Sequence, residues 1–150
     1  MIRLSKLTDY ASVLLAVMAR EPDSLWTATQ LSAHSNVPKP TCTKLLKQLA
    51  KHGLLNSIQG ARGGYALARD PQEIPVKQII EAIEGPMAIT ECGTDEALCR
   101  LTDHCTVMAR WRELGDQVNQ MLTHVTLRDL ISPHGLYARP ERRIETLEVH

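Results

Sequence analysis

Apolar residues recur at helical spacing near the start of the chain and predict two helices. The first carries apolar side chains at i, i+4, i+7, i+8 and i+11 and should end before Glu21. The second is short and can be capped by Thr27 or Thr29, because a threonine hydroxyl accepts a hydrogen bond from a free N–H group of the first turn. Ser35 and Asn36 favour a turn after it. The stripe of the first helix consists of Leu7, Ala11, Leu14, Leu15 and Met18.

A third helix is predicted from Pro38 to a stop at Gly53, and its two faces differ in chemistry. Its apolar face consists of Cys42, Leu45, Leu46 and Leu49. The polar positions are left for solvent or a ligand, and they are Thr41, Thr43, Lys44, Lys47, Gln48 and Lys51. We interpret Cys42 as a buried small hydrophobe rather than a metal ligand, because free cysteine is among the most buried residue types.

Two short apolar segments, LLNSI and YALA, follow the third helix and predict a β-hairpin with a glycine-rich tip at residues 59–64. The tip lacks both the GxGxxG order of a dinucleotide site and the Gly-Lys-Ser/Thr ending of a P-loop, so nucleotide binding is not favoured. Three helices and a two-stranded wing predict a mainly α fold, a winged helix-turn-helix domain over residues 1–85.

The second half of the chain predicts two more helices. Residues 76–84 form the first, with Ile79, Ile80 and Ile83 inward and Gly85 at its end. The second is long, and its apolar residues are spaced by 4, 3, 4, 3 and 4 positions, a 3.5-residue repeat typical of helices that pair. We expect residues 107–132 to provide a dimerisation helix and a short terminal helix, although the repeat could instead pack on its own domain. The repeat consists of Val107, Trp111, Leu114, Val118, Met121 and Val125.

Net charge is zero, with 17 basic and 17 acidic residues, but the charges are divided along the chain. Residues 1–70 carry nine Lys or Arg against four Asp or Glu, and no acidic residue lies between Asp23 and Asp70. Such a region attracts a polyanion, and an arginine at a glycine-rich tip can enter a minor groove. The alternative is an ordinary solvated basic face. The candidate DNA-binding residues are Lys39, Thr41, Thr43, Lys44, Lys47, Lys51 and Arg62.

Three of the four cysteines lie in the stretch TECGTDEALCRLTDHCTVM, residues 90–108, and all three fall within residues 86–106, which we interpret as a cysteine-rich loop. The chain has no signal-peptide pattern and no apolar run near the roughly 20 residues that span a bilayer, so we expect a cytoplasmic protein. Thiols stay reduced there, and a cysteine cluster then favours metal or redox chemistry. Cys92, Cys99 and Cys105 are spaced more widely than zinc pairs, and thiolates suit an iron–sulfur cluster at least as well.

Two alternatives from the cysteine pattern stay open. The three thiols could be unconnected surface groups, or they could serve a zinc- or thiol-based regulator on the same scaffold. A thiol enzyme is not supported, because no His–Asp or Cys-x-x-Cys arrangement activates a nucleophile. Residues from 133 to 150 are rich in Gly, Pro and charge and predict a disordered tail.

The chain resembles the bacterial iron–sulfur cluster regulators related to IscR, NsrR and SufR, and especially the regulators of the SUF assembly system. The likeness covers about residues 1–132 and rests on RLSKLTDYA, KLLKQLAKHGLLNSIQGARGGYALA, IIEAIEGPMAITEC and the cysteines followed by Trp111. It implies a homodimeric winged-helix repressor of cluster-assembly or stress genes, in which Cys92, Cys99 and Cys105 hold a [2Fe–2S] or [4Fe–4S] cluster. Cluster state would change the affinity for promoter DNA.

The resemblance leaves the fourth ligand open. Similar regulators have a histidine three residues after the last cysteine, where this chain has Met108. Asp9 matches an aspartate that reaches the cluster from the other subunit in the nitric-oxide-sensing branch. Our order of candidates is Asp9, then His104, then an exogenous ligand, and [2Fe–2S] is favoured over [4Fe–4S].

Overall fold

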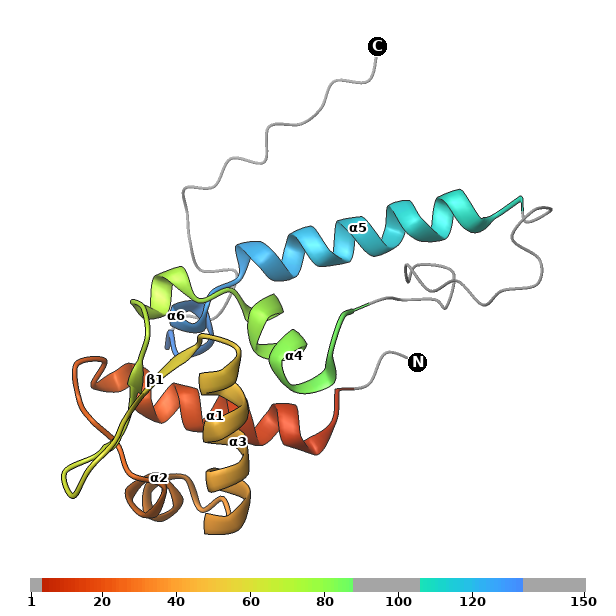
Figure 1. The fold of residues 1–150 in the computed structure, drawn as a ribbon. Helices are drawn as coiled ribbons and strands as arrows, with labels where there is room; N and C mark the ends of the chain where they lie inside the picture. The colour runs from red at the N-terminus through yellow and green to blue at the C-terminus, as the bar shows by residue number, and fades with distance from the viewer. Residues whose placement is uncertain (1–3, 88–105, 134–150) are drawn as a thin grey trace.

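The structure, a computed structural model, describes residues 4–87 and 106–133. The described part is mainly helical with one antiparallel hairpin, so the predicted fold class is confirmed (Figure 1). None of its helices is long and apolar enough to cross a membrane. The elements in chain order are α1 (Lys6–Arg20), α2 (Ala28–Ser35), α3 (Lys39–Lys51), β1 (Leu55–Ile58), β2 (Gly64–Leu67), the 3-10 helix η1 (Pro71–Glu73), α4 (Val76–Glu84), α5 (Met108–His124) and α6 (Leu127–Leu130).

Local interactions fix both ends of α2. Thr27, rather than Thr29, caps α2 in a capping box: its hydroxyl accepts from the N–H of Gln30 at 3.2 Å, and its own N–H donates to the Gln30 side chain at 2.9 Å. Asn36 ends the helix in the left-handed region with φ of +58°, a conformation that asparagine tolerates. The chain can therefore turn sharply into α3.

The wing has a third, shorter partner that the sequence pattern does not reveal. β1 and β2 pair from Leu55 opposite Leu67 to Ile58 opposite Gly64. Trp26, before α2, forms an isolated bridge with Tyr65, and each N–H donates to the other's carbonyl at 2.8 Å. This bridge fixes the hairpin to the start of the helix-turn-helix.

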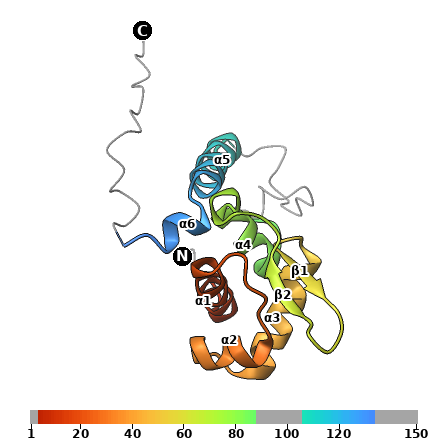
Figure 2. The same cartoon turned by 90° about the vertical axis from the view of Figure 1, so that its left-hand side faces the viewer.

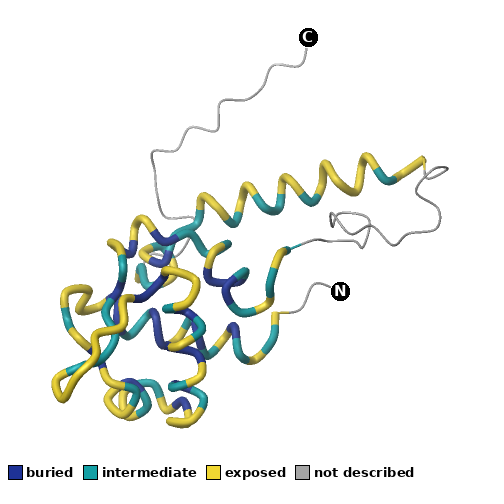
Figure 3. Tube along the Cα trace, viewed as in Figure 1, coloured by how far each residue is buried: buried dark blue, intermediate teal, exposed yellow. Residues whose placement is uncertain are grey.

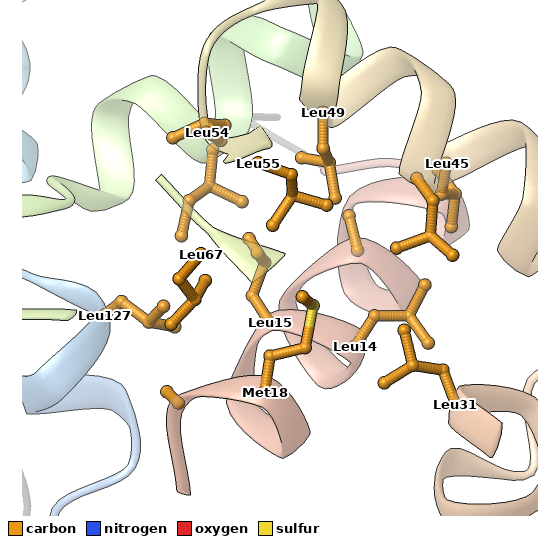
Figure 4. Packing of buried hydrophobic residues seen from close by; sticks show 14 of the residues in the cluster. Leu14, Leu15, Met18, Leu31, Leu45, Leu49, Leu54, Leu55, Leu67 and Leu127 are labelled. Carbon is orange, nitrogen blue, oxygen red and sulfur yellow. The ribbon is translucent and has the colours of Figure 1, made fainter. Parts of the chain in front are cut away.

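One apolar core joins α1, α2, α3, the wing, α4 and α6 and contains no residue of α5. Side chains from α1, α2, α3, the wing and α4 contribute, and Leu14, Leu15, Met18, Leu45 and Leu49 pack at its centre (Figure 4). The predicted apolar faces of α1 and α3 are confirmed as buried, apart from Leu7, which is half-buried.

The short helix α6 returns the chain to this core after α5. Leu127 is fully buried and packs near Leu67 (Figure 4). Backbone bonds between Val76 N–H and Val125 O and between Leu127 N–H and Ile74 O, both 2.8 Å, fix its start. The end of α5 is therefore anchored to the winged-helix domain.

Helix α5 lies outside the core, beside α4 and on the side of the molecule opposite α2 (Figures 1 and 2). It contains no buried residue in this single chain (Figure 3). Four of the six residues of the predicted repeat are exposed, namely Val107 by 53%, Trp111 by 43%, Leu114 by 44% and Met121 by 60%, whereas Val118 and Val125 are half-buried. Much of its apolar repeat therefore remains exposed in the described part of the chain.

Candidate functional site

Helix α3 presents a cationic face to solvent because its opposite face is completely buried. Cys42, Leu45, Leu46 and Leu49 are all inaccessible to solvent. Lys44, Lys47 and Lys51 recur at i, i+3 and i+7 on the other side and are exposed. Leucine packing thus determines the direction in which the three lysines point.

The N-terminal end of α3 carries the smaller candidate residues. Pro38 is the N-cap residue and makes no side-chain cap, so free N–H groups remain at this end. Lys39 is exposed, and Thr41 and Thr43 are half-buried. The Thr43 hydroxyl donates to the Lys39 carbonyl at 3.0 Å, which leaves the hydroxyl oxygen as an acceptor for a ligand.

Gln48 does not belong to the solvent-facing set in which the sequence placed it. Its Nε2 donates to the carbonyl of Ala82 at 2.9 Å and lies 3.5 Å from that of Ile83, both in the last turn of α4. Gln48 follows Leu45 by three residues and Lys44 by four, so it lies on the border between the two faces. Residue chemistry alone assigned it to the wrong side.

The wing tip combines an exposed arginine with glycines that the backbone requires. Arg62 is exposed at the end of the hairpin. Gly60 has a φ of +115°, and a Cβ on Gly63 would lie 2.3 Å from the carbonyl oxygen of Ile58. The tip is therefore narrow. Arg62 is the one positively charged residue in it. No Asp or Glu occurs from residue 24 to residue 69, the stretch that forms α2, α3 and the wing.

Cys42 is a core residue, in agreement with the sequence analysis. Its thiol donates to the carbonyl of Val37 at 3.4 Å, and burial raises the pKa of this thiol despite hydrogen bonds from Ser35 and Ser32 that lower it. A protonated, inaccessible thiol is a poor metal ligand.

The predicted cluster ligands Cys92, Cys99 and Cys105 and the candidate His104 lie outside the described residues. Within residues 4–87 and 106–133, no group of three or more His, Cys, Asp or Glu side chains could hold a metal ion. Three cysteines are nevertheless a suitable donor set for iron, because thiolate sulfur is the usual ligand of iron–sulfur clusters.

Of the candidates for the fourth ligand, Asp9 lies within the described residues. Asp9 is exposed in the first turn of α1. Met108, which stands where the resemblance leads one to expect a histidine ligand, is half-buried at the start of α5 and is not among these candidates.

The first turn of α1, which carries Asp9, is tied to the last turn of α4. The Glu84 carboxylate accepts from the Ser5 N–H at 2.8 Å and from the Thr8 hydroxyl. Hydrogen bonds from Ser5 and Thr8 lower the pKa of Glu84. The start of α1 and the end of α4, beyond which the chain continues to Cys92, therefore lie together (Figure 1).

The sequence is similar to those of transcriptional regulators. Residues 4–133 match the family described as "Rrf2: Iron-dependent Transcriptional regulator". The chain is 29% identical over 132 residues to the HTH-type transcriptional regulator IscR of Photorhabdus laumondii, which covers 87% of this chain and 80% of the relative.

Solved structures have the same fold. CymR, the global cysteine regulator of B. subtilis, aligns with a TM-score of 0.66 and 26% identity over 87% of this chain and 97% of its own. T. potens IscR aligns with a TM-score of 0.62 and 24% identity over 87% of this chain and 86% of its own.

Proposed function

Because the chain belongs to the Rrf2 family of iron-dependent transcriptional regulators, we propose that an iron–sulfur cluster held by Cys92, Cys99 and Cys105 controls its affinity for promoter DNA. The chain is a DNA-binding transcriptional regulator and not an enzyme. The observation that carries the cluster proposal is the presence of three cysteines between α4 and α5 in a chain of this family. The regulated genes are those of cluster assembly or related stress responses, and the effect is repression.

DNA contact is divided between α3 and the wing. Thr41, Thr43 and Lys44 lie in the first half of α3, from which a recognition helix reaches base edges. Lys47 and Lys51 are exposed further along α3 and would contact phosphates. Lys39 is exposed at the first position of the helix and is a further candidate DNA contact. Arg62 at the narrow wing tip suits an adjacent minor groove, where negative potential is strongest in A/T-rich sequence.

The second copy required for two half-sites would pair through α5. Four apolar side chains of the heptad repeat, Val107, Trp111, Leu114 and Met121, are exposed on a helix that has no buried residue in the single chain. Apolar surface repeated every 3.5 residues favours a helix pair. A homodimer engages half-sites about one DNA turn apart, roughly 34–36 Å.

The cysteines would hold the cluster together with one further ligand. Asp9 of the second subunit is our first candidate, because it is exposed at the start of α1 and carries an oxygen ligand. His104 is second and an exogenous ligand third. Met108 is disfavoured because its thioether is a weak ligand. A bound cluster, [2Fe–2S] in preference to [4Fe–4S], supplies a centre whose loss or oxidation changes the charge and ligation of the cysteine segment.

A second candidate is a thiol- or zinc-based regulator on the same scaffold. The similarity to CymR favours it, because that protein is described as a global cysteine regulator and the CymR of Staphylococcus aureus is also known in an oxidized form. The two candidates differ in colour: zinc and thiols are colourless, whereas an iron–sulfur cluster absorbs visible light.

The test is anaerobic purification of the wild type and of single cysteine-to-alanine variants, with absorption spectra and iron and sulfide counts. Cys92→Ala, Cys99→Ala and Cys105→Ala should each lose the visible absorption and remain folded dimers. Cys42→Ala is the matched control and should stay coloured, because its thiol is in the core. Cys99→Ala protein with wild-type colour and iron would overturn the proposed ligand set, and colourless wild type containing zinc would favour the second candidate.

A further inference from the structure

The last turn of α4 makes hydrogen bonds to two other helices at once. Its carbonyls at Ala82 and Ile83 accept from Gln48 of α3, and the carboxylate of Glu84 accepts from Ser5 and Thr8 of α1. These partners are 34 to 79 residues apart in the chain. The turn is therefore a junction of the recognition helix, the start of α1 and the chain that continues to Cys92.

Gln48 acts at this junction as a helix cap supplied by another helix. The last four carbonyls of an α-helix have no partner within the helix. In α4, Glu81 O accepts from the N–H of Gly85 at 3.0 Å, and Ala82 O, the next carbonyl, accepts from Gln48. No basic side chain lies in the last turn of α4 to serve instead. The side-chain amide of Gln48 thus connects α3 to the last turn of α4 and restricts how the two can move relative to each other.

Extending the proposed function, on which this inference rests, we propose that Gln48 is the positioning residue through which the last turn of α4 sets the recognition helix. A change in the cysteine segment that moves or frays this turn would break this hydrogen bond and allow α3 to shift slightly within its packing. Gln48 itself does not contact DNA, because its amide is directed at α4. Lys44 and Lys47, its neighbours on the exposed side of the helix, do.

Energetic coupling between two sites needs an element with two arrangements that both sites bias. In this proposal the element is the last turn of α4, and its two arrangements are the form capped by Gln48 and a frayed form without this cap. A helix end is held by few hydrogen bonds, so its opening free energy is at the low end of those within a domain. Binding at either site can shift this equilibrium, and couplings of this kind typically change affinity about 5–150-fold.

The experiment compares Gln48→Met, which removes the amide at nearly constant shape, with Gln72→Met as a matched control. Gln72 is exposed on η1, and its side chain makes no hydrogen bond in the described part of the chain. Affinity is measured for cluster-loaded and cluster-free protein, on a duplex selected by the loaded wild type from a random library and on a scrambled duplex. The ratio of loaded to cluster-free affinity should fall to within about twofold of one in Gln48→Met.

A second readout uses the cluster-free protein alone. Amide hydrogen exchange at Glu84 and Gly85 should be faster in Gln48→Met than in wild type or Gln72→Met, because an uncapped turn opens more often. Unchanged exchange at these amides would overturn the capping role.

The affinity outcomes separate the possible errors. If Gln48→Met weakens loaded and cluster-free protein equally, Gln48 is a DNA contact and the inference is wrong. If the variant keeps both wild-type affinities, and therefore a wild-type ratio above one, the amide is only a structural cap. If cluster-loaded and cluster-free wild-type protein bind the selected duplex with equal affinity, the proposed function is contradicted, and so is this inference, which rests on it.

Discussion

Leu127→Ala should destabilise the protein far more than Leu130→Ala, although both leucines belong to the four-residue helix α6. Leu127 is fully buried in the core shared by α1 and the wing, whereas Leu130 is 43% exposed. Truncating leucine to alanine removes about three carbon groups, or roughly 2.4 kcal/mol of transfer free energy at about 0.8 kcal/mol each. A cavity adds about 24 cal/mol per Å³, but a single-turn helix can partly collapse into it. We expect a loss of about 3 kcal/mol.

Thermal and urea unfolding test this at one fixed protein concentration, because the apparent stability of the proposed dimer would depend on concentration. A loss of about 3 kcal/mol corresponds to a decrease in Tm of about 6–12 °C for a chain of this size. Leu130→Ala should stay within about 0.5 kcal/mol of wild type. Weaker operator binding should accompany the loss, since Leu127 anchors the end of α5 to the winged-helix domain. If Leu127→Ala and Leu130→Ala unfold at the same temperature and the same urea concentration, α6 is not part of the core.

Other perturbations address the DNA interface, the dimer and pH. Lys47→Ala should weaken selected and scrambled duplexes alike and reduce the slope of log affinity against log salt by about one, and unchanged binding and slope would place Lys47 outside the interface. Thr43→Ala should mainly lower discrimination, by about 1–3 kcal/mol per lost base contact, so equal loss on both duplexes argues against a base contact. Trp111→Glu combined with Leu114→Glu should give monomers by light scattering; a dimer that binds DNA normally would show that α5 pairs differently. Glu84 has a lowered pKa from its bonds to α1. The stability difference between wild type and Glu84→Gln should therefore be complete above the ordinary carboxyl pKa of about 4.3 and shrink as pH falls through the lower folded value, and a difference that grows on acidification contradicts this sign.

Periodicity is sufficient to predict most of the fold, because burial imposes a period on residues that share a helix. Leu45, Leu46 and Leu49 show this in α3, and all three are inaccessible to solvent. Sequence periodicity cannot predict a contact that involves a single residue outside any repeating pattern. Trp26 reaches Tyr65 through one isolated bridge, and nothing in the residues around Trp26 predicts a strand.

The candidate site is predictable to the same extent. Lys44, Lys47 and Arg62 are exposed where the helix and hairpin patterns placed them. Gln48 was assigned to the ligand-facing set because amphipathicity sorts residues by chemistry and ignores what packs opposite them. Its acceptors on α4 are 34 and 35 residues away, so no local pattern contains the pairing. The feature of the sequence that could have indicated this contact is the position of Gln48 on the border of the apolar face.

The central claim is that the state of the cysteine segment controls DNA binding, and one anaerobic titration tests it most directly. Wild-type protein of known iron and sulfide content is divided, and one half is stripped of its cluster. Both halves are titrated, at one salt concentration, against a duplex selected from a random library and against its scrambled form. We predict that the affinity of the two halves for the selected duplex differs at least about fivefold, the lower end of typical allosteric coupling, and that their affinity for the scrambled duplex is the same. Equal affinity for the selected duplex, with iron and sulfide present in one half and absent from the other, would contradict the account.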